Sequence, residues 1–313
     1  MTTAASTTCA RLKAEVRPFR PVALQLLRMV GSPTVAFGKV AGLVQTDAVL
    51  SMELLKIANS PLFQMRMEIS SVLQAIVFLG SDMVSALVLT TCLKSLVAAR
   101  SSPFILACWR HCLATALICQ RLSDAMKIPE SNGYTAGLIH DIGQLALLSV
   151  YPSYEKALGS AKKGGSDLLD VERELFGLDH SEAGRWLLSE WGCPLELQNV
   201  AAYHENPLQA KARDGNLVRL VHGSSALANL MGMSVTELAQ REDLSQIAAA
   251  LPEARPELTV KGFGELTENV LTKVNGVEVS LGLGPMAPAP SSGPTHSPWR
   301  PCESFVSRLP GTA

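Results

Sequence analysis

The chain has almost no excess of charge of either sign. Its 313 residues include 27 lysines and arginines and 28 aspartates and glutamates, which gives a formal net charge of -1. Proteins that attract nucleic acid or an anionic membrane do so with a basic surface field, and this composition supplies none. We therefore expect neither nucleic acid nor a membrane as a partner.

The sequence also lacks the segments that carry a chain to or across a membrane. Residues 1–6 have no charged stretch and no apolar core of the kind that a signal peptide needs. Polar residues interrupt the richest apolar run before it reaches the length of a membrane span: Ser85, Thr90, Thr91, Lys94 and Ser95. The seven cysteines are too scattered for a disulfide framework. These features predict a protein of a reducing cytoplasm.

No segment alternates polar and apolar residues well enough for a strand, whereas signals for helices recur along the chain. Three pairs have the spacing of a helix capping box: Ser71 with Gln74, Asp179 with Glu182, and Ser234 with Glu237. Apolar residues recur at helical spacing between these pairs. With 47% apolar residues the chain can bury a large core, so the fold class is predicted to be all-α.

Composition divides the chain into successive parts. We predict an unstructured N-terminus (1–15), an N-terminal helical lobe (16–100), a second helical lobe (104–232), a helical extension (233–280) and a disordered tail (281–313). The tail consists mainly of Pro, Gly, Ser and Ala and cannot bury enough surface to offset its chain entropy. The alternative for its end is a short motif, Trp299 to Leu309, that docks a partner.

The candidate site is centred on residues 138–143, with the sequence LIHDIG. The adjacent side chains of His140 and Asp141 can bind one metal ion together, through an imidazole nitrogen and a carboxylate oxygen. Three more histidines fall within, at the start of, and at the end of predicted helices: His111, His180 and His204. We expect these five side chains to be partly buried, to converge on one cleft of the second lobe and to hydrogen bond one another. Gly143 is expected to let two helices meet closely beside the pair.

The region before this set contains three further motifs: DAVL at 47–50, LLKIANS at 54–60, and ISSVLQAI at 69–76, closing at Leu79-Gly80. Together with the ordered histidines they resemble the HDOD domain, a bacterial signalling relative of the HD superfamily of metal-dependent phosphohydrolases. The resemblance covers roughly Val16 to Gly232. It implies a two-lobed helical fold with an HD-like second lobe.

The resemblance places His111, His140 and Asp141 at three metal-ligand positions of HD enzymes. Their fourth ligand is an aspartate in a V-H-x-A-D-x-L-A pattern, which falls on residues 221–228 and puts Ser225 at the aspartate's place. A serine hydroxyl is neutral and cannot offset the charge of a divalent ion as a carboxylate does. His222 could face a similar direction, but it would need a shifted metal.

Two further positions depart from the active enzymes in the same direction. Gln144 stands where they commonly carry a lysine that stabilises phosphate charge, and a neutral amide cannot replace that cation. Their paired histidines correspond here to His204-Glu205, so one imidazole is missing. Losing one positioned acid, base or charge costs on the order of a hundredfold in rate. The sequence also has no Gly-rich phosphate loop, nucleophile elbow or CxxC pair.

We therefore predict a pseudo-enzyme: a non-catalytic regulatory HDOD module that acts through protein–protein interaction in bacterial signal transduction. Its expected partners are other signalling proteins, with a small nucleotide as a possible ligand. No cofactor is expected. The sequence leaves open whether a divalent Fe, Mn or Zn ion binds at His111, His140 and Asp141. The alternative is a metal-dependent phosphohydrolase of nucleotides or cyclic dinucleotides, in which Asp141 would be catalytic.

Overall fold

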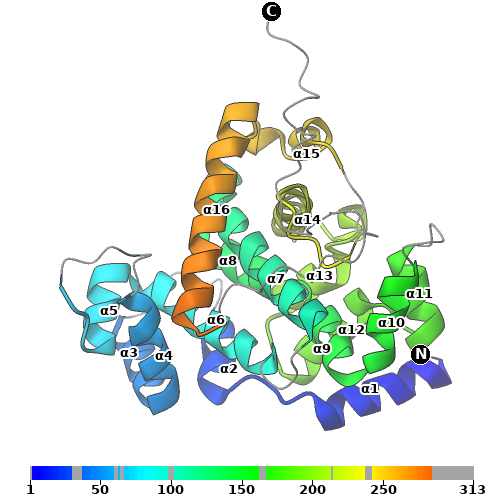
Figure 1. The fold of residues 1–313 in the computed structure, drawn as a ribbon, viewed down its shortest axis with the longest axis horizontal. Helices are drawn as coiled ribbons and strands as arrows, with labels where there is room; N and C mark the ends of the chain where they lie inside the picture. Colours follow the sequence, from blue (N-terminus) through cyan, green and yellow to red (C-terminus); the bar gives the residue numbers. More distant parts are fainter. Residues whose placement is uncertain are drawn as a thin grey trace, which may run out of the picture.

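The computed structural model describes residues 2–29, 37–59, 63, 67–97, 102–161, 167–212, 214–236 and 242–283, and within these ranges its regular structure is entirely helical, as the sequence predicts (Figure 1). The helices are α1 (Thr3–Glu15), α2 (Pro21–Leu27), α3 (Phe37–Gln45), α4 (Ala48–Ala58), α5 (Val72–Leu79), α6 (Ser81–Val97), α7 (Pro103–Leu122), α8 (Glu130–Ile139), α9 (Ile142–Val150), α10 (Pro152–Ala161), α11 (Leu168–Phe176), α12 (His180–Glu190), α13 (Leu195–Tyr203), α14 (Gly215–Leu230), α15 (Leu244–Ala250) and α16 (Val260–Ser280), with short 3-10 turns at Pro207–Gln209 and Pro252–Ala254.

The first helix, α1, differs from the expectation that residues 1–15 lack regular structure. Thr2 caps it by accepting a hydrogen bond from the Ala5 N–H at 3.2 Å. Its buried face consists of Ala5, Thr8, Cys9 and Leu12, and it packs against α9, α11 and α12 of the second lobe. Apart from Leu12 these side chains are small, which lets the helix approach its neighbours closely.

The N-terminal lobe consists of α2 to α6 and lies to the left in Figure 1. Asp47 caps α4 as predicted, because its Oδ1 accepts hydrogen bonds from the N–H groups of Val49 and Leu50 at 3.1 Å. At the other end of α4, the Asn59 side chain bonds both the N–H and the carbonyl of Ile69, at 2.7 and 2.8 Å. The asparagine of the ANS motif therefore fixes the segment that leads into α5.

The predicted capping boxes have three different outcomes. Asp179 and Glu182 form a complete box at the start of α12. Ser71 caps α5, but the Gln74 side chain accepts its hydrogen bonds from Ser70 instead of from the Ser71 N–H. Glu237 of the third pair lies outside the described residues, as does the tail from residue 284.

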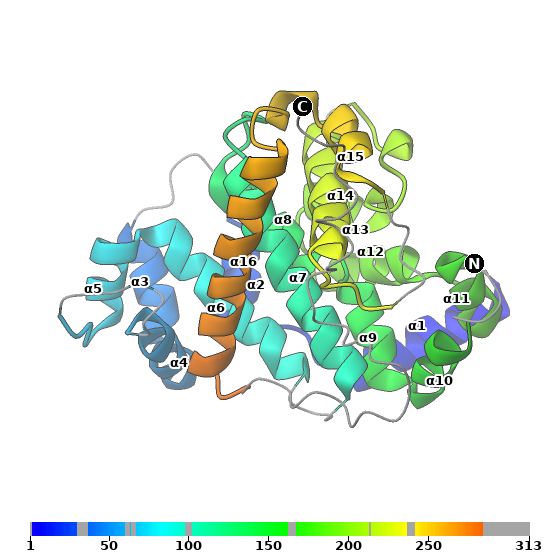
Figure 2. The same ribbon diagram turned by 45° about the horizontal axis from the view of Figure 1, so that its top comes forward.

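Helix α7 is the central helix of the second lobe. It packs against α8 on one side and α14 on another (Figure 2). In the described part of the chain, α7 is the one helix whose length and composition would let it cross a membrane, contrary to the expectation that no run is long enough. Within the fold 72% of its apolar window is buried, which is the placement of a core helix.

Helix α16 lies along α7 and reaches the N-terminal lobe, where its end contacts α4 (Figure 1). It forms the last part of the predicted helical extension and ends at Ser280, the last residue of that range. Arg110 of α7 and Glu278 of α16 form a buried ion pair, and the Lys94 ammonium donates to the Leu281 carbonyl at 2.5 Å. The C-terminal extension is thus joined to both lobes.

Candidate metal centre

Five helix ends or faces bring the predicted site residues together. His140 and Asp141 form the junction between α8 and α9, His111 lies within α7, His180 is the first residue of α12, and His204 directly follows α13. All five side chains are buried, more completely than the sequence suggested. These residues, His111, His140, Asp141, His180 and His204, are called the histidine–aspartate cluster below.

The Asp141 carboxylate lies at the centre of this cluster. Its Oδ2 is 3.4 Å from His140 Nε2 and 3.8 Å from His111 Nε2. Its Oδ1 is 3.1 Å from His204 Nε2 and 3.6 Å from His180 Nε2. One carboxylate oxygen therefore faces each pair of imidazoles.

The other ring nitrogen of each histidine is held by a protein acceptor. The Nδ1 atoms of His111, His140 and His204 lie 3.0, 2.7 and 3.0 Å from the carbonyl oxygens of Met233, Gly137 and Ala201, and His180 Nδ1 lies 2.7 Å from the Glu172 carboxylate. A carbonyl or carboxylate oxygen can only accept, so Nδ1 donates in each case. In the neutral imidazoles the lone pair is then on Nε2, which faces Asp141.

Burial and charge divide the four imidazoles into two pairs. Burial lowers the pKa of His111 and lowers that of His140 to about 3, so both rings are neutral. Burial acts in the same direction on His180 and His204, but Glu172 outweighs it at His180 and Asp141 outweighs it at His204, so both pKa values are raised. Burial would raise the pKa of Asp141, yet the surrounding imidazoles hold it well below its ordinary value.

The cluster fits a metal ion. His140 Nε2 and Asp141 Oδ1 are buried and have no hydrogen-bond partner within the described residues, although buried polar atoms are rarely left in this state. Two sets of donor atoms are close enough together to hold an ion: one from His111, His140 and Asp141, and one from Asp141, His180 and His204. An ion at either set would act as a Lewis acid or as a structural link between helices.

The positions that depart from HD enzymes lie at the border of the cluster. The Ser225 hydroxyl is 3.1 Å from His111 Nε2, close to where the missing carboxylate would bind. His222 does not replace that ligand, because its Nδ1 donates to the His204 carbonyl at 2.6 Å and its Nε2 lies 3.8 Å from Glu242. Gln144 is buried on α9 and contacts the Tyr154 hydroxyl.

Two carboxylates beside the cluster were not identified as site residues from the sequence. Glu172 of α11 is fully buried and bonds His180 and Tyr154. From the sequence, Glu205 was noted only because it replaces a histidine of the HD enzymes. In the structure its Oε1 lies 3.6 Å from both His180 Nε2 and His204 Nε2. Glu172 sits among exposed charged residues on a short amphipathic helix, so no sequence signal separates it from a surface residue.

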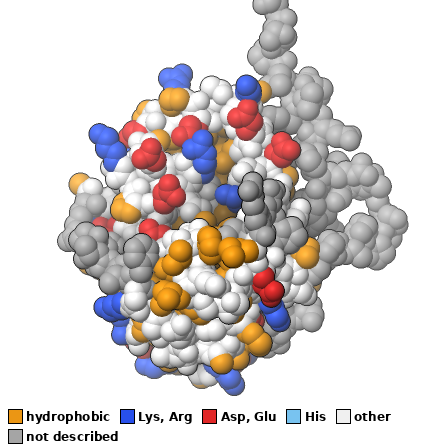
Figure 3. All heavy atoms as spheres, turned by 90° about the vertical axis from the view of Figure 1, so that its left-hand side faces the viewer, with side chains coloured by type: hydrophobic (Ala, Val, Ile, Leu, Met, Phe, Trp, Pro, Cys, Tyr) orange, Lys and Arg blue, Asp and Glu red, His pale blue; other side chains and the backbone are white. Residues whose placement is uncertain are grey.

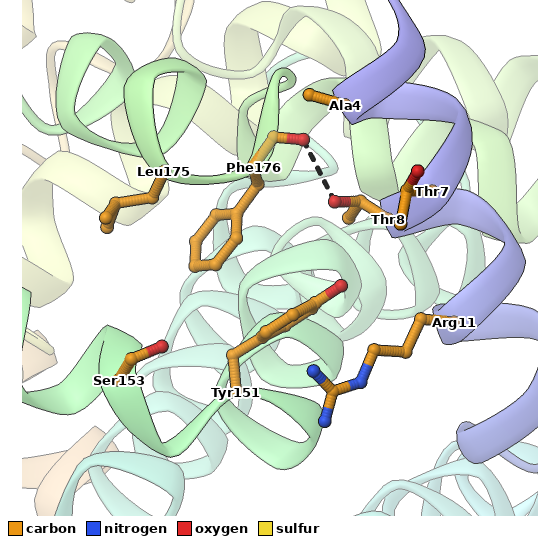
Figure 4. Close-up of a pocket in the computed structure, with 8 residues that line it drawn as sticks. All are labelled: Ala4, Thr7, Thr8, Arg11, Tyr151, Ser153, Leu175 and Phe176. Carbon is orange, nitrogen blue, oxygen red and sulfur yellow. Dashed lines mark hydrogen bonds between the residues drawn. The ribbon is translucent and has the colours of Figure 1, made fainter.

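A surface pocket of about 420 Å³ lies elsewhere, between α1, α10 and the end of α11 (Figure 4). The Arg11 guanidinium lies 4.5 Å above the centroid of the Tyr151 ring at this pocket, and the Thr8 hydroxyl donates to the Phe176 carbonyl at 2.9 Å. No member of the histidine–aspartate cluster lines it.

The helical fold and the histidine–aspartate cluster are those of an HD-type domain. A family model for the HDOD domain matches residues 17–207, and the chain belongs to the HDOD domain family. This agrees with the motifs on which the resemblance was based.

Three solved structures share the fold. An HDOD domain protein of Geobacter sulfurreducens is 19% identical, with a TM-score of 0.72 over 88% of this chain and 98% of that chain. A proposed phosphohydrolase of Shewanella amazonensis SB2B is 22% identical, with a TM-score of 0.66 over 90% and 99%. A proposed signal transduction protein of Marinobacter aquaeolei VT8 is 20% identical, with a TM-score of 0.69 over 88% and 65%.

A curated relative, an uncharacterized protein of Treponema pallidum (strain Nichols), is 23% identical over 192 residues. The match spans 58% of this chain and 36% of that protein, so it covers about a third of the relative's length. At these identities the structural likeness establishes the fold, and the chemistry has to be argued from the residues of this chain.

Proposed function

We propose that this chain is a non-catalytic HDOD module that regulates cytoplasmic signalling in a bacterium by binding other proteins. The observation that carries the proposal is the hydrogen bond between Ser225 Oγ and His111 Nε2, at 3.1 Å. The ring nitrogen that would face a catalytic ion is engaged by a neutral hydroxyl. The carboxylate that would balance the charge of that ion is missing from this position.

Access to the cluster supports the same conclusion. The side chains of the histidine–aspartate cluster are at most 8% exposed, so little of Asp141 is accessible to a phosphate group. The neighbouring Gln144 amide is buried and neutral, so it cannot stabilise the charge that develops in phosphoryl transfer. Both features favour a structural role for the cluster.

The N-terminal lobe offers the surface for a protein partner. Apolar side chains that are 45–72% exposed gather on α4, on α5 and just before α5 (Figure 3): Val49, Met52, Met67, Leu73, Val77 and Phe78. We call this set the α4–α5 face. Helix α5 has no charged residue, and contiguous exposed apolar surface is typical of a protein-binding site.

The alternative is a metal-dependent phosphohydrolase of nucleotides or cyclic dinucleotides, in which His111, His140 and Asp141 bind the ion. The observation that favours it is the convergence of four Nε2 atoms on one carboxylate. That arrangement would suit a metal ion, but it does not supply the missing cation.

The test measures turnover and partner binding in the same preparation of the full chain. With added Mn²⁺, Fe²⁺ or Zn²⁺, we expect hydrolysis of nucleotides and cyclic dinucleotides no faster than that of Asp141→Ala. Proteins retained from a lysate by the wild type should be lost with Val77→Glu and kept with Val260→Glu, a matched control because Val260 is 55% exposed on another helix. Turnover that disappears in Asp141→Ala would establish the alternative.

A further inference from the structure

We infer that this chain binds one transition-metal ion through Asp141, His180, His204 and Glu205. This set differs from the set that the HD resemblance implies, which uses His111 and His140. It includes Glu205, the residue that stands in this chain where the HD enzymes have their second paired histidine. The inference goes beyond the proposed function, because it concerns an ion that would hold the fold together.

Five separations between the four donor atoms are close to the edges of a tetrahedral site, and Asp141, His180 and His204 form one of the two sets whose atoms could hold an ion. Asp141 Oδ1 is 3.1 Å from His204 Nε2 and 3.6 Å from His180 Nε2. The two Nε2 atoms are 3.3 Å apart, and Glu205 Oε1 is 3.6 Å from each of them. A regular tetrahedron with ligand bonds of about 2.0–2.2 Å has edges of roughly 3.3–3.6 Å.

The two imidazoles are oriented for this role before any ion binds. His180 donates both its main-chain N–H and its Nδ1–H to Glu172, each at 2.7 Å, and His204 donates Nδ1–H to the Ala201 carbonyl at 3.0 Å. Hydrogen bonds of this kind fix the ring and leave Nε2 as the ligand atom. The two Nε2 atoms, 3.3 Å apart, share a hydrogen bond when one of them is protonated, and a bound cation would take the place of that proton.

Charge also favours this side of the cluster over the other. Asp141 and Glu205 together supply two negative charges, which balance a divalent ion in a buried site. The opposite set has one carboxylate and the neutral Ser225 hydroxyl, and His111 Nε2 lies 3.8 Å from Asp141. The Glu205 side chain is 43% exposed, so it also provides a route from solvent to the buried ligands.

An ion held by four protein ligands has no open position for a substrate, which is the arrangement of structural rather than catalytic sites. It would link the start of α9, the start of α12 and the end of α13. These helices come from three separate parts of the second lobe, so the ion would act as a cross-link within it.

The test uses the purified full chain after treatment with a chelator. Titration with Co²⁺ should give one ion per chain and the intense visible absorption bands of tetrahedral Co²⁺, and Zn²⁺ should displace it and raise the melting temperature. Glu205→Gln should weaken Co²⁺ binding at least tenfold, and Glu205→His should retain it. Ser225→Ala should leave affinity and spectrum unchanged.

Two controls keep the outcome clear. Glu174→Gln alters an exposed carboxylate of α11 and should bind Co²⁺ like the wild type. Urea denaturation of the metal-free variants checks that each is folded. Failure to bind Co²⁺ or Zn²⁺, an octahedral spectrum, or equal affinities for wild type and Glu205→Gln would each overturn the inference, and loss of binding in Ser225→Ala would move the ion to the His111 side.

Discussion

Glu172 accepts two hydrogen bonds from His180, one from the main-chain N–H and one from Nδ1, both at 2.7 Å. The carboxylate is completely buried, and it raises the pKa of His180 against the opposing effect of burial. Removing one partner of a buried ion pair leaves the other charge uncompensated. Glu172 thus fixes the first residue of α12 and orients a ring of the histidine–aspartate cluster.

We expect Glu172→Ala to lower the free energy of unfolding by about 3–5 kcal/mol, the usual cost of breaking a buried pair. Urea denaturation at neutral pH measures the loss. Glu174→Ala is the matched control on the same helix, because Glu174 is exposed and its removal should cost no more than about 0.5 kcal/mol. Equal losses in the two variants would show that the contact to His180 contributes nothing to stability.

Asp141→Ala should lower the stability of the metal-free protein by about 1.5–3 kcal/mol. Asp141 raises the pKa of His204 against the effect of burial, and without Asp141 a positive charge on His204 loses a carboxylate oxygen 3.1 Å away. Denaturation of both proteins, with and without a chelator, measures this difference. A variant as stable as the wild type would contradict the expected role of Asp141, and a loss of stability in the wild type on chelation would show that an ion contributes as well.

The sequence predicted those features that depend on local signals. Asp47 and Asp179 cap the helices that they were expected to cap, because a capping side chain bonds only N–H groups of the first turn of its own helix. The convergence of His111, His140, Asp141, His180 and His204 came from the ordered motifs of the family.

The features that the sequence did not predict depend on contacts between distant segments. The small residues of α1 are buried because this helix packs against α9, α11 and α12, which are distant in the sequence. The same holds for Glu172 and Glu205, whose roles follow from side-chain directions that only the packed helices define. Glu172 lies eight positions before His180, and no local sequence pattern indicates that the two side chains are in contact. The contact depends on how α11 packs against α12.

Gly143 lies at a close contact between α9 and α12. A Cβ atom at this position would lie 1.9 Å from the His180 carbonyl oxygen and 2.5 Å from the Gly184 nitrogen, and both are backbone atoms that cannot move aside alone. Gly143→Ala should therefore destabilise the protein by about 3 kcal/mol, despite the better helix propensity of alanine.

The control is Gly264→Ala in α16, where an added Cβ would meet nothing within 4 Å. This variant should gain up to about 1 kcal/mol from helix propensity. Thermal or urea denaturation of both variants against the wild type gives the comparison. If Gly143→Ala were also more stable, the close approach of the two helices would not limit this position.

The last prediction concerns pH and the Asp47 side chain. Burial raises the pKa of Asp47, but the Arg20 guanidinium, at 2.8 and 3.0 Å, and two N–H groups of α4 outweigh it, so the pKa falls below its ordinary value of 3.8. A lowered pKa means that the folded protein favours the ionised carboxylate. Its stabilising contribution is therefore complete above about pH 4 and is lost as the pH falls through the folded-state value.

We expect the wild type to exceed Asp47→Asn in stability by about 1 kcal/mol at pH 7, because asparagine keeps the helix cap but loses the ion pair with Arg20. The difference should shrink as the pH falls below 3.8 and through the lowered folded-state pKa of Asp47. Urea denaturation at pH 7, 5, 4 and 3 follows it. In an Arg20→Gln background the same substitution should cost clearly less at pH 7. A difference between wild type and Asp47→Asn that stays constant from pH 7 to 3 would assign the effect to the shape of the cap and not to the charge of Asp47.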